Sequence, residues 1–160
     1  MGWFGFGSKI PKGAVVFCDL AFIAEHSGIC IGDDEIIHLN GDGDIEKVSF
    51  YEFIARLDGL NHTLFETNLS YFVDEDDNPI ASKKFIKRAK NMLGSSRDYH
   101  PLLDNCHQFT SGCITGNFEN SDNFFWMLKE TIKNEFSISD LYYIEKSCSV
   151  DKNNKTLEFV

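Results

Sequence analysis

A short hairpin is the sequence feature that most constrains how this chain can fold. Residues 27–32 (SGICIG) and 35–39 (EIIHL) are apolar and β-prone, and only a short polar turn separates them. This pattern predicts two paired antiparallel strands. His26 stands at the mouth of the first strand, and His38 lies on the second. Because paired strands bring opposed residues together, we expect the two histidines to lie side by side.

Further strands are expected on both sides of the hairpin. Residues 14–20 (AVVFCDL) follow a Pro-Lys-Gly turn and are apolar, and residues 63–69 (TLFETNL) have a similar character. The segment LYYIEKS at 141–147 indicates one more strand. The polar run after it is expected to form a loose tail.

Helices are expected between and after these strands. Ser49 and Glu52 have the spacing of a capping box for a short helix at 50–57. Pro79 suits the first turn of a second helix, whose apolar stripe spans residues 80–93.

Two more helices complete the expected fold. One starts near Asn105, and the other covers 122–136 with Ser121 as its cap. The last helix is expected to bury Phe124, Leu128, Ile132 and Phe136. Because helices and a mostly antiparallel sheet fall in separate blocks, the sequence predicts an α+β fold. A chain of 160 residues has the usual size of a single domain, 1–160.

Charge and composition exclude several classes of protein. The formal net charge is −10, from 15 basic and 25 acidic residues, so no nucleic-acid partner is expected. No apolar run has the length of a bilayer span, so no integral membrane segment is expected. The N-terminus lacks the pattern of a secretory signal, and the five cysteines are an odd number, so we expect reduced thiols and a cytoplasmic location. The oligomeric state stays open.

Cys106 is the candidate nucleophile. It stands at the start of an expected helix, where orphan N–H groups and the helix dipole lower the pKa of a cysteine. A thiolate attacks carbonyl groups, and a nearby imidazole can take the thiol proton and later give it to the leaving group. His26 is the candidate base, and His38 is the candidate third residue that orients its ring.

These motifs resemble the lecithin:retinol acyltransferase family. The pattern His-x2-Ile-x-Ile-Gly-Asp starts at His26, Ile-His-Leu surrounds His38, and Asn-Cys-x2-Phe surrounds Cys106. The similarity covers residues 11–116, with a C-terminal helix and tail at 117–160. It implies a circularly permuted papain-like fold, related to the NlpC/P60 hydrolases, in which the histidines precede the cysteine.

The resemblance also implies roles and a reaction. Cys106 is then the nucleophile, His26 the general base and His38 the orienting residue. Family members form an acyl thioester on the cysteine from an ester or amide donor, often a phospholipid. They then pass the acyl group to water, an amine or an alcohol, so the implied partner is a small-molecule or lipid acyl substrate.

The residues after the nucleophile differ from the family pattern. The family commonly has Asn-Cys-Glu-His-Phe, whereas this chain has His107 and Gln108 after the cysteine, and Ser27 replaces the aromatic that usually follows the first histidine. Two alternatives therefore stay open. One is an NlpC/P60-like amidase or peptidase, and the other is a non-catalytic binding module of the same fold.

Asn105, His107 and Tyr99 are further candidates for a substrate or oxyanion site. The backbone N–H of Cys106 is a natural oxyanion donor if the helix begins there. His107 points about 100° around the helix from Cys106, so it either helps the oxyanion site or faces solvent. Tyr99 either lines the site or packs. No metal or other cofactor is expected, because the sequence has no Cys-x2-Cys pair, and a catalytic zinc bound by Cys106, His26 and His38 is only a third alternative.

Overall fold

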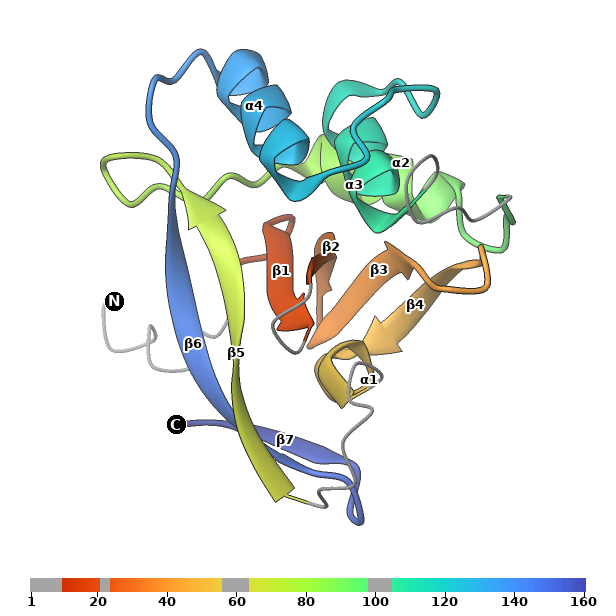
Figure 1. Cartoon of the computed structure of the whole chain (residues 1–160), viewed down its shortest axis with the longest axis vertical. Helices are drawn as coiled ribbons and strands as arrows, with labels where there is room; N and C mark the ends of the chain where they lie inside the picture. Colours follow the sequence, from red (N-terminus) through yellow and green to blue (C-terminus); the bar gives the residue numbers. More distant parts are fainter. Residues whose placement is uncertain (1–9, 21–23, 56–63, 98–104) are drawn as a thin grey trace.

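The computed structural model describes residues 10–20, 24–55, 64–97 and 105–160 (Figure 1). Within them, seven antiparallel strands form one sheet in the order β4-β3-β2-β1-β5-β6-β7. The strands are β1 (Val15–Leu20), β2 (Ala24–Gly32), β3 (Glu35–Leu39), β4 (Ile45–Ser49), β5 (Leu64–Val73), β6 (Tyr142–Asp151) and β7 (Thr156–Phe159). The helices are α1 (Phe50–Ala55), α2 (Lys83–Asn91), α3 (Cys106–Thr115) and α4 (Phe125–Phe136). The predicted mixed α+β class is confirmed.

The sheet has an apolar layer on each face. Val15 and Phe17 of β1 point toward the layer shared with α2, α3 and α4, whereas Val16 and Cys18 point toward the layer that contains Phe53 of α1. Successive side chains of a strand alternate between faces, so a strand buried on both faces is apolar throughout. Figure 1 shows α2, α3 and α4 together on one side of the sheet, with α1 beside β3 and β4.

The long ribbon of β5, β6 and β7 curls away from the rest of the sheet (Figure 1). β5 and β6 pair over ten residues, from Leu64 with Asp151 to Val73 with Tyr142. The curl brings β7 against α1, where the rings of Phe50 and Phe159 meet edge to face with their centroids 6.0 Å apart. The prediction that the chain end forms a loose tail is therefore wrong, because residues 156–159 form β7.

The predicted hairpin is confirmed. β2 and β3 pair antiparallel, and Asp33 and Asp34 between them have φ values of 54° and 59°. Two consecutive residues with positive φ are typical of the tight turns whose twist suits a hairpin, and aspartate tolerates this conformation better than most residues. The predicted capping box is also present, since Ser49 and Glu52 each accept a hydrogen bond from the other's backbone N–H.

The prediction that Pro79 lies in the first turn of a helix is wrong. The N–H of Ile80 donates to the carbonyl of Phe72, and its own carbonyl accepts from the N–H of Val15. Ile80 is therefore paired into the sheet, between the start of β1 and the end of β5. The helix starts three residues later, after Ser82, whose hydroxyl caps the first turn of α2.

The start of α4 also differs from the prediction. Ser121 is not its cap, because the N-cap position is Phe124 and no side chain makes a capping bond there. Leu128 and Ile132 are buried as predicted, but Phe124 and Phe136 are 46% and 37% exposed. Each step of four residues turns about 40° around a helix, so the two ends of this row rotate away from the core.

In the part of the chain that the structure describes, no helix combines the length and the apolar character that crossing a membrane requires.

Candidate active site

Three neighbouring strands bring together a chain of hydrogen-bonded polar side chains. Nε2 of His26 on β2 lies 2.7 Å from Nδ1 of His38 on β3. Nε2 of His38 donates to Oε2 of Glu46 on β4 over 3.0 Å. Both histidines are buried, His38 completely. The prediction that the two histidines lie together is confirmed.

Gly28 explains how the two imidazole rings reach each other. β2 and β3 pair Ile29 with Ile37, and the same register continues to place Gly28 opposite His38. The two histidines are therefore diagonal neighbours on one face of the sheet. A Cβ at position 28 would lie only 3.2 Å from Cβ of His38 and 2.9 Å from the carbonyl oxygen of Ile37. The missing side chain leaves the space in which the rings meet.

Phe53 of α1 packs against both imidazoles. Its ring centroid lies 4.8 Å from that of His26 and 5.5 Å from that of His38. This residue is completely buried, so it closes the apolar side of the histidine pair. An aromatic wall of this kind restricts the ring orientations that the histidines can adopt.

Cys106 is the first residue of α3, as predicted, and it is 8% exposed. Asn105 is the N-cap, and its side-chain oxygen accepts hydrogen bonds from the N–H groups of His107 and Gln108. Its amide nitrogen donates to the carbonyl of Asn123, 2.6 Å away. The cap fixes where the helix begins, and it therefore fixes the position of the candidate nucleophile.

A buried network joins this first turn of α3 to β2. Oγ of Ser27 lies 2.8 Å from Nδ1 of His107 and 2.9 Å from Oγ1 of Thr110. Thr110 in turn donates to the carbonyl of Cys106 over 2.8 Å. His107, the residue after the candidate nucleophile, is thus hydrogen-bonded to Ser27, the residue after His26. This network holds the start of α3 against the strand that carries the candidate base.

His107 does not face solvent, so that part of the prediction is wrong. It is 5% exposed, and its ring lies 5.4 Å from the ring of Phe125, measured between centroids. Burial lowers the pKa of His107 to about 4, although a hydrogen bond with the backbone of Glu25 opposes the shift. The side chain is therefore neutral near pH 7, and it acts in the structure as a neutral hydrogen-bonding group.

Three other cysteines lie in environments that suppress their reactivity. Burial raises the pKa of Cys30 and of Cys148 to about 11, and it also raises the pKa of Cys113. Buried neutral thiols are poor nucleophiles, so these residues are part of the core. Among the described residues, no group of three or more His, Cys, Asp or Glu side chains is arranged to hold a metal ion.

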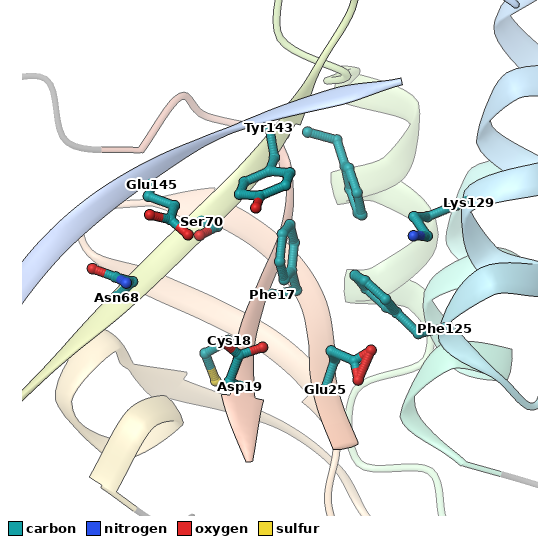
Figure 2. Close-up of a pocket in the computed structure, with 11 residues that line it drawn as sticks. Phe17, Cys18, Asp19, Glu25, Asn68, Ser70, Phe125, Lys129, Tyr143 and Glu145 are labelled. Carbon is teal, nitrogen blue, oxygen red and sulfur yellow. The ribbon is translucent and has the colours of Figure 1, made fainter. Parts of the chain in front are cut away.

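A cavity of about 250 Å³ lies beside α4, over β1, β5 and β6 (Figure 2). Its wall includes the aromatic residues Phe17, Phe72, Phe125 and Tyr143. Phe125 is the residue whose ring also contacts His107, so the cavity adjoins the first turn of α3. Glu25 and Lys129 lie on the same side of the cavity (Figure 2). Burial and the nearby charge of Asp19 raise the pKa of Glu25, and Lys129 opposes this shift.

Several members of these networks were not predicted from the sequence. Glu46, Ser27 and Thr110 were not predicted to contact the candidate residues. Glu46 lies on a strand that was not predicted, Ser27 occupies a variable position of the first motif, and Thr110 follows the last motif. Tyr99, the remaining predicted site residue, lies outside the described residues.

The fold and the site define a class: a mixed α+β protein with a cysteine at a helix start and a histidine pair on the adjoining sheet. The sequence profile described as lecithin retinol acyltransferase matches residues 8–119. The chain belongs to this family of acyltransferases and thiol hydrolases, and the predicted resemblance is confirmed. No curated protein matches the chain.

Proposed function

We propose that this protein is a cysteine-dependent hydrolase or acyltransferase that forms an acyl thioester on Cys106. The observation that carries the proposal is the hydrogen-bonded chain of His26, His38 and Glu46, which lies on the Phe53 face of β2, β3 and β4. α3 packs directly on β2 and begins at the cysteine. A nucleophile, a base and a group that orients the base are the three components that acyl transfer by a thiol requires.

The first half of the reaction transfers the acyl group to sulfur. His26 takes the proton of the Cys106 thiol, and the thiolate attacks the carbonyl carbon of an ester or amide. The tetrahedral intermediate collapses when the bond to the alcohol or amine breaks. The imidazolium of His26 gives its proton to this leaving group, and the thioester remains.

The second half releases the acyl group. His26 removes a proton from water, an alcohol or an amine, which attacks the thioester carbonyl. The sulfur leaves as a thiolate, and the proton on His26 returns to it. The backbone N–H of Cys106 is the proposed donor to the oxyanion in both halves, because the first N–H groups of a helix have no intrahelical acceptor.

The order of the site residues supports a circularly permuted papain-like fold. Both histidines precede the cysteine in the chain, and the cysteine begins a helix packed on the strand of the base. Four aromatic side chains line the cavity, which also has charged residues in its wall, and one of them, Phe125, contacts His107. They offer surface for an acyl chain, so a lipid acyl group is the proposed donor. All five cysteines are thiols, which suits the reducing cytoplasm as the proposed location.

A thiol-labelling experiment tests the nucleophile and its base. We expect iodoacetamide to label Cys106 at neutral pH faster than an ordinary cysteine, since the base promotes the thiolate. Cys106→Ala removes this labelling and His26→Ala slows it about tenfold or more. Cys30→Ala is the matched control, since a thiol with a pKa of about 11 contributes no fast labelling at neutral pH. Labelling of Cys106 at the rate of a free cysteine contradicts the proposal.

A second experiment identifies the acyl donor. The protein is incubated with a short-chain phosphatidylcholine or with an N-acyl peptide, and the intact mass is measured after acid quenching. An acyl adduct from the lipid, absent in Cys106→Ala, is the expected result. An adduct from the peptide alone favours the amidase or peptidase alternative, and no adduct from either favours a binding module.

A further inference from the structure

We propose that Glu46 is a positioning residue that selects the tautomer of both histidines and thereby makes Nδ1 of His26 the basic atom of the site. This inference rests on the proposed function, because it concerns the base of that reaction. It adds Glu46, hydrogen-bonded to His38, as a third polar side chain after His26 and His38.

The geometry of the sheet lets Glu46 act on His26 through His38. His38 and Glu46 are direct partners in the antiparallel register of β3 and β4, so their side chains point to the same face. The bond between them is 3.0 Å long. His38 is fully buried, whereas the Glu46 side chain is 41% exposed. The carboxylate therefore keeps part of its hydration while it anchors a ring in the interior.

The proton positions follow from the chemistry of the three groups. An ionised carboxylate only accepts, so Nε2 of His38 carries the hydrogen. In a neutral ring the other nitrogen is then an acceptor, and Nδ1 of His38 accepts from Nε2–H of His26. Nδ1 of a neutral His26 then carries the lone pair. This is the state in which the ring takes a proton from the Cys106 thiol.

Glu46 also faces the positive charge that forms during the reaction. When His26 takes the thiol proton, the carboxylate at the end of the chain stabilises the imidazolium through His38. Glu46 lines an open groove of about 610 Å³, and the other charged residues of this groove, Asp42 and Glu52, are acidic as well. Lys47 of β4 pairs with Glu35 on the opposite face of the sheet, so it does not neutralise Glu46.

The test begins with ¹⁵N NMR of the histidine side chains in the full-length wild-type protein near pH 7. We expect both His26 and His38 to carry hydrogen on Nε2 and a lone pair on Nδ1. In Glu46→Leu, which has no acceptor, we expect His38 to populate both tautomers. Glu46→Gln retains an acceptor oxygen, so we expect it to retain the wild-type tautomers.

Labelling of Cys106 with iodoacetamide across pH supplies the functional readout. We expect Glu46→Leu to slow labelling near neutral pH about tenfold or more and to move the midpoint of the pH profile upward, because the thiolate–imidazolium pair loses its support. Glu46→Gln should slow labelling less than Glu46→Leu does. Asp42→Asn removes one negative charge from the same groove, and we expect it to keep both the tautomers and the rate of the wild type.

The inference is overturned if His26 and His38 of the wild-type protein carry hydrogen on Nδ1. This result needs no variant, so it holds even if a variant fails to fold. It is also overturned if folded Glu46→Leu keeps both the tautomers and the pH profile of the wild type. Failure of the proposed function looks different: the predicted tautomers are present and change in Glu46→Leu, but Cys106 reacts no faster than a free cysteine. In that case Glu46 still positions the histidines.

Discussion

At the scale of single residues, Gly28 decides whether the two histidines meet. We expect Gly28→Ala to slow labelling of Cys106 at neutral pH by tenfold or more. The added methyl group would lie 2.8 Å from Cγ2 of Ile36 and 3.2 Å from Cβ of His38, so the strands must shift to admit it. Overpacking of this kind costs about 1–3 kcal/mol of unfolding free energy. Urea denaturation and the labelling rate, measured on the same sample, check both effects.

A matched control separates the geometric effect of Gly28→Ala from a general loss of stability. Ile29 is the next residue of β2 and is buried on the opposite face. Ile29→Val costs about 0.5–1.5 kcal/mol without touching the histidine pair. Labelling should survive in this variant. If Cys106 is labelled as fast in Gly28→Ala as in Ile29→Val, the absence of a side chain at position 28 is not required for the reactivity of Cys106.

His107 makes the stability of the protein depend on pH. Burial holds its folded-state pKa at about 4, below the ordinary value of 6.5. The contribution of the neutral ring to stability is therefore complete above pH 6.5. As the pH falls toward 4, the unfolded chain binds a proton that the folded protein excludes, and up to about 3 kcal/mol of unfolding free energy is lost.

Urea denaturation of the wild type and of His107→Asn at several pH values between 7 and 4 measures this contribution. Asparagine places a polar atom near the position of Nδ1, so it can keep a bond to Ser27 without titrating. We expect the wild type to lose more unfolding free energy than the variant over this range. Parallel pH dependences of the two proteins would show that His107 does not titrate with the expected shift.

The sequence predicts some site residues and not others, for a physical reason. His26, His38 and Cys106 have side chains of the types that thiol chemistry requires, and they lie in a predicted hairpin or at the start of a predicted helix. Glu46 and Thr110 act through hydrogen bonds to partners on other elements. Such bonds depend on strand register and helix packing, which single residues and local patterns do not encode.

At the scale of elements, the N-cap of α3 sets the position of Cys106, the proposed nucleophile. We expect Asn105→Ala to lower the unfolding free energy by about 1–2 kcal/mol, because one cap and one further hydrogen bond are lost. The first turn should also fray, and the position of Cys106 relative to the proposed base, His26, is then no longer fixed. Labelling at neutral pH should therefore slow in the folded variant.

Ser82→Ala provides the comparison for this cap. Ser82 caps α2 and accepts a hydrogen bond from the N–H of Lys84, so its loss costs a similar amount, about 1 kcal/mol. α2 does not carry a candidate catalytic residue. Equal slowing of labelling in Asn105→Ala and Ser82→Ala would mean that stability, and not the placement of the cysteine, controls the rate.

Element boundaries were predictable where a local signal agrees with tertiary structure. Asn105 is such a case, since a helix is predicted to start near it and the structure places it at the N-cap of α3. Pro79 is the opposite case, because pairing of Ile80 with the sheet overrides the local preference for a helix start. β4 (IEKVS) was missed because its two apolar residues, Ile45 and Val48, do not alternate. They face opposite layers of the sheet.

At the scale of the whole molecule, the part of the chain beyond the family match is built into the core. The family profile ends at residue 119, but α4 and β6 follow it. Leu128 and Ile132 of α4 and Val150 of β6 are completely buried. β6 also covers one edge of β5 along its whole length. The candidate site and the C-terminal segment therefore share one folded structure, although the candidate site residues all lie within residues 8–119.

This arrangement predicts the behaviour of a truncated chain. We expect the fragment 1–119 to lose its fixed tertiary structure, because it exposes the β5 edge and forfeits the burial of α4 and β6. Each large aliphatic side chain contributes about 1.5–3 kcal/mol on burial. Three of them approach the ~5–15 kcal/mol by which a domain of this size is stable. An uncovered strand edge also promotes association between chains.

Near-ultraviolet circular dichroism and size-exclusion chromatography of the full chain and of 1–119 test this expectation. The fragment should lack the aromatic signal of the folded protein and elute as aggregates. A second fragment, 1–151, removes only β7 and the turn before it, whose side chains are at most partly buried. It should stay folded and label at Cys106 with a reduced melting temperature. A monomeric fragment 1–119 with native aromatic signals and fast labelling of Cys106 would contradict this expectation. The core would then not depend on the side chains that α4 and β6 bury.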